Sequence, residues 1–197
     1  MAITTPPIST DALWRLTVDQ YHAMIRAGIL TTDDPVELLQ GWLITKMPKH
    51  PRHRVVTQLT REALARILPG GWYVDAQEPI TTADSEPEPD VVIVRGERRQ
   101  YLDRHPGPRD VALVVEVADS TLLRDRSFKK RLYAAAGIPV YWIMNLVDNR
   151  LEVYTEPTGE GEQADYRESH HHAPAEVLDV VIDDHKIGRI EIRDLLV

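Results

Sequence analysis

The chain has 197 residues, of which 43% are hydrophobic and 27% charged, and its formal net charge at pH 7 is −8. This length suits a single domain, which we place at residues 13–197 after a flexible N-terminal tail of residues 1–12. The absence of cysteine excludes disulfides, thiolate metal sites and a cysteine nucleophile. No apolar run approaches the ~20 residues that span a bilayer and no signal peptide is visible, so we expect a cytoplasmic protein without a membrane partner.

The first half of the chain predicts two helices and several short strands. Thr17 and Gln20 form a capping-box pattern at the start of a helix that Gly28 ends. A basic loop, Lys46–Arg54, leads into a second helix that ends before Pro69-Gly70-Gly71. The expected strands are a pair within 36–44 joined near Gln40-Gly41, followed by 72–74, 78–82 and 90–94.

The second half predicts one helix among further strands. The helix covers 125–136, with Gly137 as its stop. The expected strands are 113–118, 140–144 and 151–154; residues 155–168 read as a loop, and residues 190–196 as a short strand and a helical turn. This order indicates an α/β fold of mixed α+β type.

The run 113–118 (Leu-Val-Val-Glu-Val-Ala) is typical of a central strand covered on both faces. Alternation puts Glu116 on the same face as Val114 and Ala118. An unpaired buried carboxylate costs several kcal/mol or becomes protonated, so Glu116 needs a cation, a metal ion or an opening to solvent. The simplest alternative is a glutamate at a strand end, paired with an arginine or a lysine.

Three residues together suggest chemistry: Asp90 at the start of one strand, Glu116 in the next, and Lys129 on the following helix. Adjacent strands would bring the two carboxylates to one edge of the sheet, and a divalent cation would turn their repulsion into binding. Acidic oxygen ligands suit Mg²⁺ or Mn²⁺. A nearby lysine would position or deprotonate the attacking water, or hold the scissile phosphate. Taken singly, Asp90 reads as a solvated turn residue, and Asp125 and Lys129 as a surface pair at i, i+4.

A family resemblance strengthens this interpretation. The chain resembles the Uma2 (Uma-two) family, a bacterial group of restriction-endonuclease-like proteins in the PD-(D/E)xK nuclease superfamily, mainly in Pro89-Asp90, Glu116–Thr121, Asp125, Lys129, Tyr133 and Gly137–Trp142. The resemblance implies a restriction-endonuclease-like core, a mixed sheet flanked by helices, and a Mg²⁺-dependent nuclease site with Asp90 and Glu116 as the metal-binding acids. The superfamily lysine stands two residues after the second acid, where this chain has Ala118. In the family that this chain resembles, the lysine stands on the following helix instead, at the position of Lys129.

The same resemblance gives Glu37 a supporting or metal-shell role, and His53, which supports the site from the basic loop, reads as a phosphate contact or a structural cap rather than a general base. A chain of charge −8 binds DNA only where its cations gather, so two basic segments, 46–54 and 124–131, are candidate backbone contacts. The candidate side chains are Lys49, Arg52 and Lys130. His170-His171-His172 reads as a solvated run rather than a metal site.

The sequence thus predicts an endodeoxyribonuclease that hydrolyses DNA phosphodiester bonds with metal-activated water. DNA is the expected partner and a homodimer the candidate assembly. Two alternatives stay open: an inactive nucleic-acid- or protein-binding module on the same fold, and a hydrolase of another phosphate ester.

Overall fold

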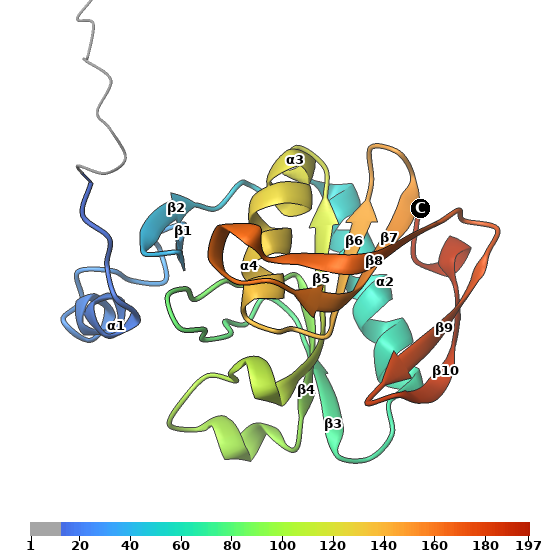
Figure 1. The fold of residues 1–197 in the computed structure, drawn as a ribbon, viewed down its shortest axis with the longest axis horizontal. Coiled ribbons are helices and arrows are strands. Elements are labelled where there is room, and N and C mark those ends of the chain that lie inside the picture. Colours follow the sequence, from blue (N-terminus) through green and yellow to red (C-terminus); the bar gives the residue numbers. More distant parts are fainter. Residues whose placement is uncertain (1–12) are drawn as a thin grey trace, which may run out of the picture.

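A mixed six-stranded sheet, in the order β3-β4-β5-β6-β7-β8, forms the centre of the protein (Figure 1). The computed structural model describes residues 13–197, so the tail predicted at residues 1–12 lies outside the described residues. Only β5 and β6 run parallel, and the other neighbours pair antiparallel. The strands are β3 (Trp72–Asp75), β4 (Val91–Arg95), β5 (Val111–Ala118), β6 (Val140–Asn145), β7 (Arg150–Thr158) and β8 (Asp165–His172).

Strand β5 is buried along its whole length, as its apolar run predicts. Leu113, Val115 and Val117 point into one core layer, which is covered by α2 (Pro51–Ile67) and the hairpin of β9 (Val177–Ile182) and β10 (His185–Glu191). Val114 and Ala118 point into the opposite layer, under α4 (Lys130–Ala135). The predicted alternation is therefore confirmed, and it leaves Glu116 beneath the helical layer that follows β5.

The N-terminal elements begin as the sequence predicts. Thr17 and Gln20 make both hydrogen bonds of a capping box at the start of α1 (Val18–Arg26). Strands β1 (Val36–Leu39) and β2 (Trp42–Thr45) form a hairpin whose two turn residues have positive φ, 47° at Gln40 and 80° at Gly41. Two-residue hairpin turns that follow the twist of the strands require this backbone conformation, which glycine adopts without strain.

The helical segment after β5 differs from the expected single helix over 125–136. It starts earlier, with α3 (Leu122–Arg124), passes through a π-helical turn over Asp125–Lys129, and continues as α4. The predicted stop is confirmed, because Gly137 has a φ of 75° and its N–H bonds to the carbonyl of Ala134. Single π-turns inside helices occur often at functional sites, and this one carries Asp125 at its start and Lys129 at its end.

Three other expectations need correction. Residues 78–82 form no strand; the N–H of Ile80 bonds to the carbonyl of Pro87, and Pro79 cannot donate to a ladder. The basic segment 46–54 is not all loop, because α2 begins at Pro51. Proline suits the first turn of a helix, where its missing N–H would have no partner.

The predicted loop over 155–168 is also wrong at both ends. Strand β7 continues to Thr158 and β8 starts at Asp165, so the polar stretch is largely an edge hairpin. Polar and charged side chains are usual on an exposed edge strand and resemble a loop in composition. The described residues also form four 3₁₀ turns: Arg98–Tyr101, Pro108–Asp110, Gly161–Gln163 and Ile192–Asp194, the last of which confirms the predicted C-terminal turn.

No helix in the described part of the chain is both long enough and apolar enough to cross a membrane.

An ion pair between the buried carboxylate of Glu152 and the partly exposed Arg126 ties the helical segment to the sheet. The Arg126 guanidinium donates to both carboxylate oxygens of Glu152, which also accepts from Asn145 at 2.6 Å and Tyr154 at 2.8 Å. Burial alone would raise the pKa of Glu152, but these donors outweigh it and lower the pKa to about 2. The ionised carboxylate therefore stabilises the folded state.

Stability should follow this ionisation. Because the folded pKa lies below the ordinary value of 4.5, the contribution is complete above about pH 5 and is lost as pH falls towards 2. Glu152→Gln should cost about 3 kcal/mol at pH 7, and the difference from wild type should shrink as pH falls. Urea unfolding of both proteins from pH 7 to pH 3 measures it. A difference that stays constant with pH would show that the ionisation contributes nothing.

Candidate active site

A polar cleft opens at the carboxyl end of β5, between the start of α2, the α3–α4 segment and the loop after β2. Its walls carry six carboxylates and four lysine or arginine cations, a formal charge of −2. The carboxylates are Glu37, Glu88, Asp90, Glu116, Asp119 and Asp125, and the cations are Lys46, Lys49, Arg124 and Lys129.

Asp90 sits immediately before β4, at the start of the cleft wall. Strands β4 and β5 pair with Val91 opposite Val115, and extending this register by one residue sets Asp90 opposite Glu116. The Val117 N–H donates to Asp90 Oδ2 at 2.9 Å, and His53 Nε2 lies 3.0 Å from the same oxygen. Burial would raise the pKa of Asp90, but His53, the Val117 N–H and Lys49, whose Nζ lies 3.4 Å from Oδ1, together lower it.

Glu116 faces the cleft from β5, and its Oε1 accepts two hydrogen bonds: from Lys129 Nζ at 2.9 Å and from the Tyr133 hydroxyl at 2.6 Å. Burial raises the pKa of Glu116 to about 8 despite the attraction of Lys129, and the neighbouring acids Asp125 and Asp90 add to the rise. The expected pairing of this buried acid is confirmed, yet its ionised form remains poorly compensated. A further cation would stabilise it.

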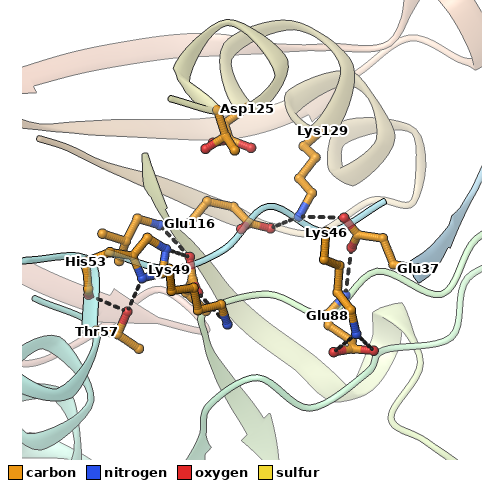
Figure 2. Close-up of polar contacts among 12 residues, drawn as sticks. Glu37, Lys46, Lys49, His53, Thr57, Glu88, Glu116, Asp125 and Lys129 are labelled. Carbon is orange, nitrogen blue, oxygen red and sulfur yellow. Dashed lines mark hydrogen bonds and ion pairs between the residues drawn. The ribbon is translucent and has the colours of Figure 1, made fainter. Parts of the chain in front are cut away.

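Lys129 reaches from the end of the π-turn into the space between two acids (Figure 2). Its Nζ lies 2.9 Å from Glu116 and 3.5 Å from Glu37, and only 5% of its side chain is exposed. Burial would lower the pKa of Lys129, but the surrounding carboxylates outweigh burial and raise it. The lysine is therefore an ammonium at neutral pH. Glu37 is positioned by the Glu88 N–H, which donates to it at 3.2 Å.

Asp125 is a buried residue and does not lie on the protein surface. It is 2% exposed, it accepts from the Thr121 hydroxyl at 2.6 Å, and burial raises its pKa. The interpretation of Asp125 and Lys129 as a solvated pair on one helix face is thus wrong, because the π-turn turns both residues into the cleft.

Two cleft contacts escaped the sequence analysis. Tyr133 is part of the family motif, but its spacing gave no sign that its hydroxyl would hold Glu116. Lys46 pairs with both oxygens of Glu88 at 2.9 Å, a contact between segments 42 residues apart. Only the three-dimensional approach of the β2 loop to the segment before β4 reveals it.

Of the three candidate side chains for DNA-backbone contact, Lys49, Arg52 and Lys130, only Lys49 lies in the cleft. Arg52 instead donates to the carbonyls of Val197 and Leu146 and to Asn149, at 2.6–2.9 Å, so it anchors the C-terminus. Lys130 pairs with Asp165 at 2.7 Å, on another side of the helical segment from the cleft. Neighbouring helix residues point about 100° apart, which a count of charges does not take into account.

The histidine run lies on β8, and alternation along the strand separates His171 from His170 and His172. His172 Nδ1 lies 2.9 Å from Glu176. The described residues contain no group of three histidine, aspartate or glutamate side chains arranged to hold a metal ion.

Residues 18–183 match the model of a protein family, Uma2, which is described as "putative restriction endonuclease". The chain belongs to the Uma2 family. The crystal structure of a "putative nuclease" of the DUF820 group from Anabaena variabilis has the same fold, with a TM-score of 0.64 and 15% identity, over 91% of this chain and 97% of that chain. No curated protein matches the chain.

Most of the residues that carry the family resemblance lie around the cleft, whereas Gly137–Trp142 lead into the buried strand β6. The block 116–121 runs down β5 into the base of the cleft, and Asp125, Lys129 and Tyr133 follow along one side of the helical segment. The predictions of Uma2 membership and of a mixed sheet flanked by helices are confirmed.

Proposed function

We propose that this protein is a Mg²⁺-dependent endonuclease that hydrolyses DNA phosphodiester bonds in the cleft at the end of β5. One observation carries the proposal: Asp90, immediately before β4, lies opposite Glu116 of the neighbouring antiparallel strand β5, with Lys129 2.9 Å from Glu116. Membership of a family of nuclease type supports the reaction class.

The donor set fits a hard divalent cation. Both acids are buried at the cleft wall, and their oxygens are the ligand type that Mg²⁺ and Mn²⁺ prefer. Mg²⁺ commonly binds through one or two carboxylates together with waters and substrate phosphates, so a preformed cage of three side chains is not required. When bound, the ion would neutralise phosphate charge and lower the pKa of the attacking water.

The side chains around the acids have separate tasks. Lys129, held as an ammonium, is unsuited to remove a proton; its role is to orient the water or the scissile phosphate and to stabilise developing negative charge. Tyr133 and Glu37 hold Glu116 and Lys129 in place, and His53 does the same for Asp90. These contacts pre-organise the site.

The cleft has a formal charge of −2 before metal binds, so it disfavours a polyanionic substrate until a divalent cation is present. Metal binding and DNA binding should therefore be mutually supportive. A single domain over residues 13–197, a cytoplasmic location and a homodimeric assembly complete the proposal.

The test is cleavage of supercoiled plasmid, linear duplex and single-stranded DNA with Mg²⁺, with Mn²⁺ or with EDTA, beside p-nitrophenyl phosphate as a monoester. We expect metal-dependent cuts within DNA, none in EDTA, and little turnover of the monoester. DNA binding without any cleavage would instead identify an inactive binding module. Turnover of the monoester alone would identify a hydrolase of another phosphate ester.

A further inference from the structure

One cation of the cleft differs from the others. Lys46, Lys49 and Lys129 each have a carboxylate partner within 3.5 Å. Arg124 lines the same cleft, but no described residue forms an ion pair or a hydrogen bond with its guanidinium. The free cation of the site is thus an arginine and not one of the lysines.

The surroundings of Arg124 make this lack of a partner costly. Its Nε is buried and has no hydrogen-bond acceptor among the described residues. The next residue, Asp125, is close enough for the charge of Arg124 to oppose the rise of its pKa, but its carboxylate accepts a hydrogen bond from the Thr121 hydroxyl and none from Arg124. A buried N–H of a charged group without an acceptor is destabilising, so an oxygen acceptor supplied by a ligand in the cleft would relieve this cost at Arg124.

We infer that Arg124 binds a non-bridging oxygen pair of the phosphate group next to the scissile one. The inference rests on the proposed function and assigns the substrate class more closely. A guanidinium presents a planar fork that matches two phosphate oxygens, which a lysine ammonium does not. Arg124 is half-buried, whereas Lys129 lies 5% exposed beside Glu116, so the arginine stands nearer the rim than the reacting centre does.

A contact to a neighbouring phosphate selects polynucleotides. A phosphomonoester or a lone nucleoside monophosphate has no second phosphate for Arg124, so it would gain only the interactions at the acid pair. The cleft's formal charge of −2 makes this contact more important, because the other cations are already shared with acids.

The test compares Arg124→Gln with Arg131→Gln. Arg131 is a matched control, because its Nε is also buried without a partner, yet it does not line the cleft. Binding of a fluorescently labelled duplex is followed by anisotropy across salt concentrations, with Ca²⁺ in place of Mg²⁺ to prevent cleavage. Arg124→Gln should weaken binding at least about tenfold and reduce the salt slope by about 0.9, the change for one lost phosphate contact.

Arg131→Gln should keep the wild-type affinity and slope. Arg124→Lys, which keeps the charge but loses the fork, should recover the salt slope and only part of the affinity. In cleavage assays the loss in Arg124→Gln should appear mainly in KM, since the contact persists from the ground state to the transition state. Equal behaviour of Arg124→Gln and Arg131→Gln, or full affinity in Arg124→Gln, would overturn the inference.

The design separates the two claims. If the wild-type protein binds DNA through Arg124 but never cleaves it, the proposed nuclease function fails while the phosphate contact stands. If it cleaves DNA and Arg124→Gln binds normally, the contact fails while the function stands. Thermal melting shows whether Arg124→Gln is folded. If it is unfolded, the affinity of Arg124→Lys for the DNA duplex tests the phosphate contact instead.

Discussion

Asp90→Asn and Glu116→Gln should each reduce metal-dependent DNA cleavage by at least about a thousandfold, or about 4 kcal/mol of transition-state stabilisation. Both substitutions preserve shape. An asparagine oxygen still accepts from the Val117 N–H, and a glutamine oxygen still accepts from Tyr133, so the fold should persist. What each variant loses is the negative charge that the divalent ion requires. Single-turnover cleavage at saturating Mg²⁺, together with thermal melting, measures the two effects separately.

The matched control for this pair is Glu86→Gln. Glu86 is a buried carboxylate four residues before Asp90, bonded to His22 and Thr81, and it does not line the cleft. Its replacement should alter stability more than cleavage. If Glu86→Gln lost as much activity as Asp90→Asn, general loss of buried charge would explain the result, and the assigned acids would lose their special role.

Lys129→Met should lower cleavage about a hundredfold and should also destabilise the protein when metal is absent. Removal of one partner from a buried ion pair typically costs about 3–5 kcal/mol, because the remaining charge stays buried. Glu37 would be left in this position, while Glu116, whose pKa is already raised by burial, would take up a proton. For a chain of this size, a loss of 3 kcal/mol lowers the melting temperature by about 6–12 °C.

Magnesium should restore much of that loss, because a divalent ion offers the acids a new cation. Lys130→Met is the matched control: its partner Asp165 is 54% exposed, and exposed pairs contribute only about 0–1 kcal/mol. Melting curves with EDTA and with Mg²⁺, followed by cleavage assays, test both variants. Similar losses of activity in Lys129→Met and Lys130→Met would indicate a diffuse charge effect and contradict the specific role of Lys129.

The acid pair was predictable because its signals are local. A carboxylate in an otherwise apolar strand identifies Glu116, alternation gives its face, and the strand order brings Asp90 beside it. The side chains that hold these acids were harder to predict. Tyr133 and Lys46 contact partners 17 and 42 residues away, and their spacing in sequence carries no trace of those contacts.

The basic segments show a different limit. The sequence places Lys49 and Arg52 three residues apart, but one lies beside Asp90 and the other holds the C-terminal carbonyl of Val197. The π-turn is likewise invisible in residue pattern, yet it decides that Asp125 and Lys129 face inward. The charge composition of the sequence identifies the two basic segments. Only the path of the backbone shows which of their cations can contact a phosphate and which stabilise the fold.

The most direct test of the account is calorimetric titration of Mn²⁺ into the wild-type protein and Asp90→Asn. We predict binding to the wild type at the Asp90–Glu116 pair and loss of that binding in the variant, while both proteins melt as folded domains. Equal Mn²⁺ binding by the two proteins would place the metal elsewhere and contradict the proposed active site.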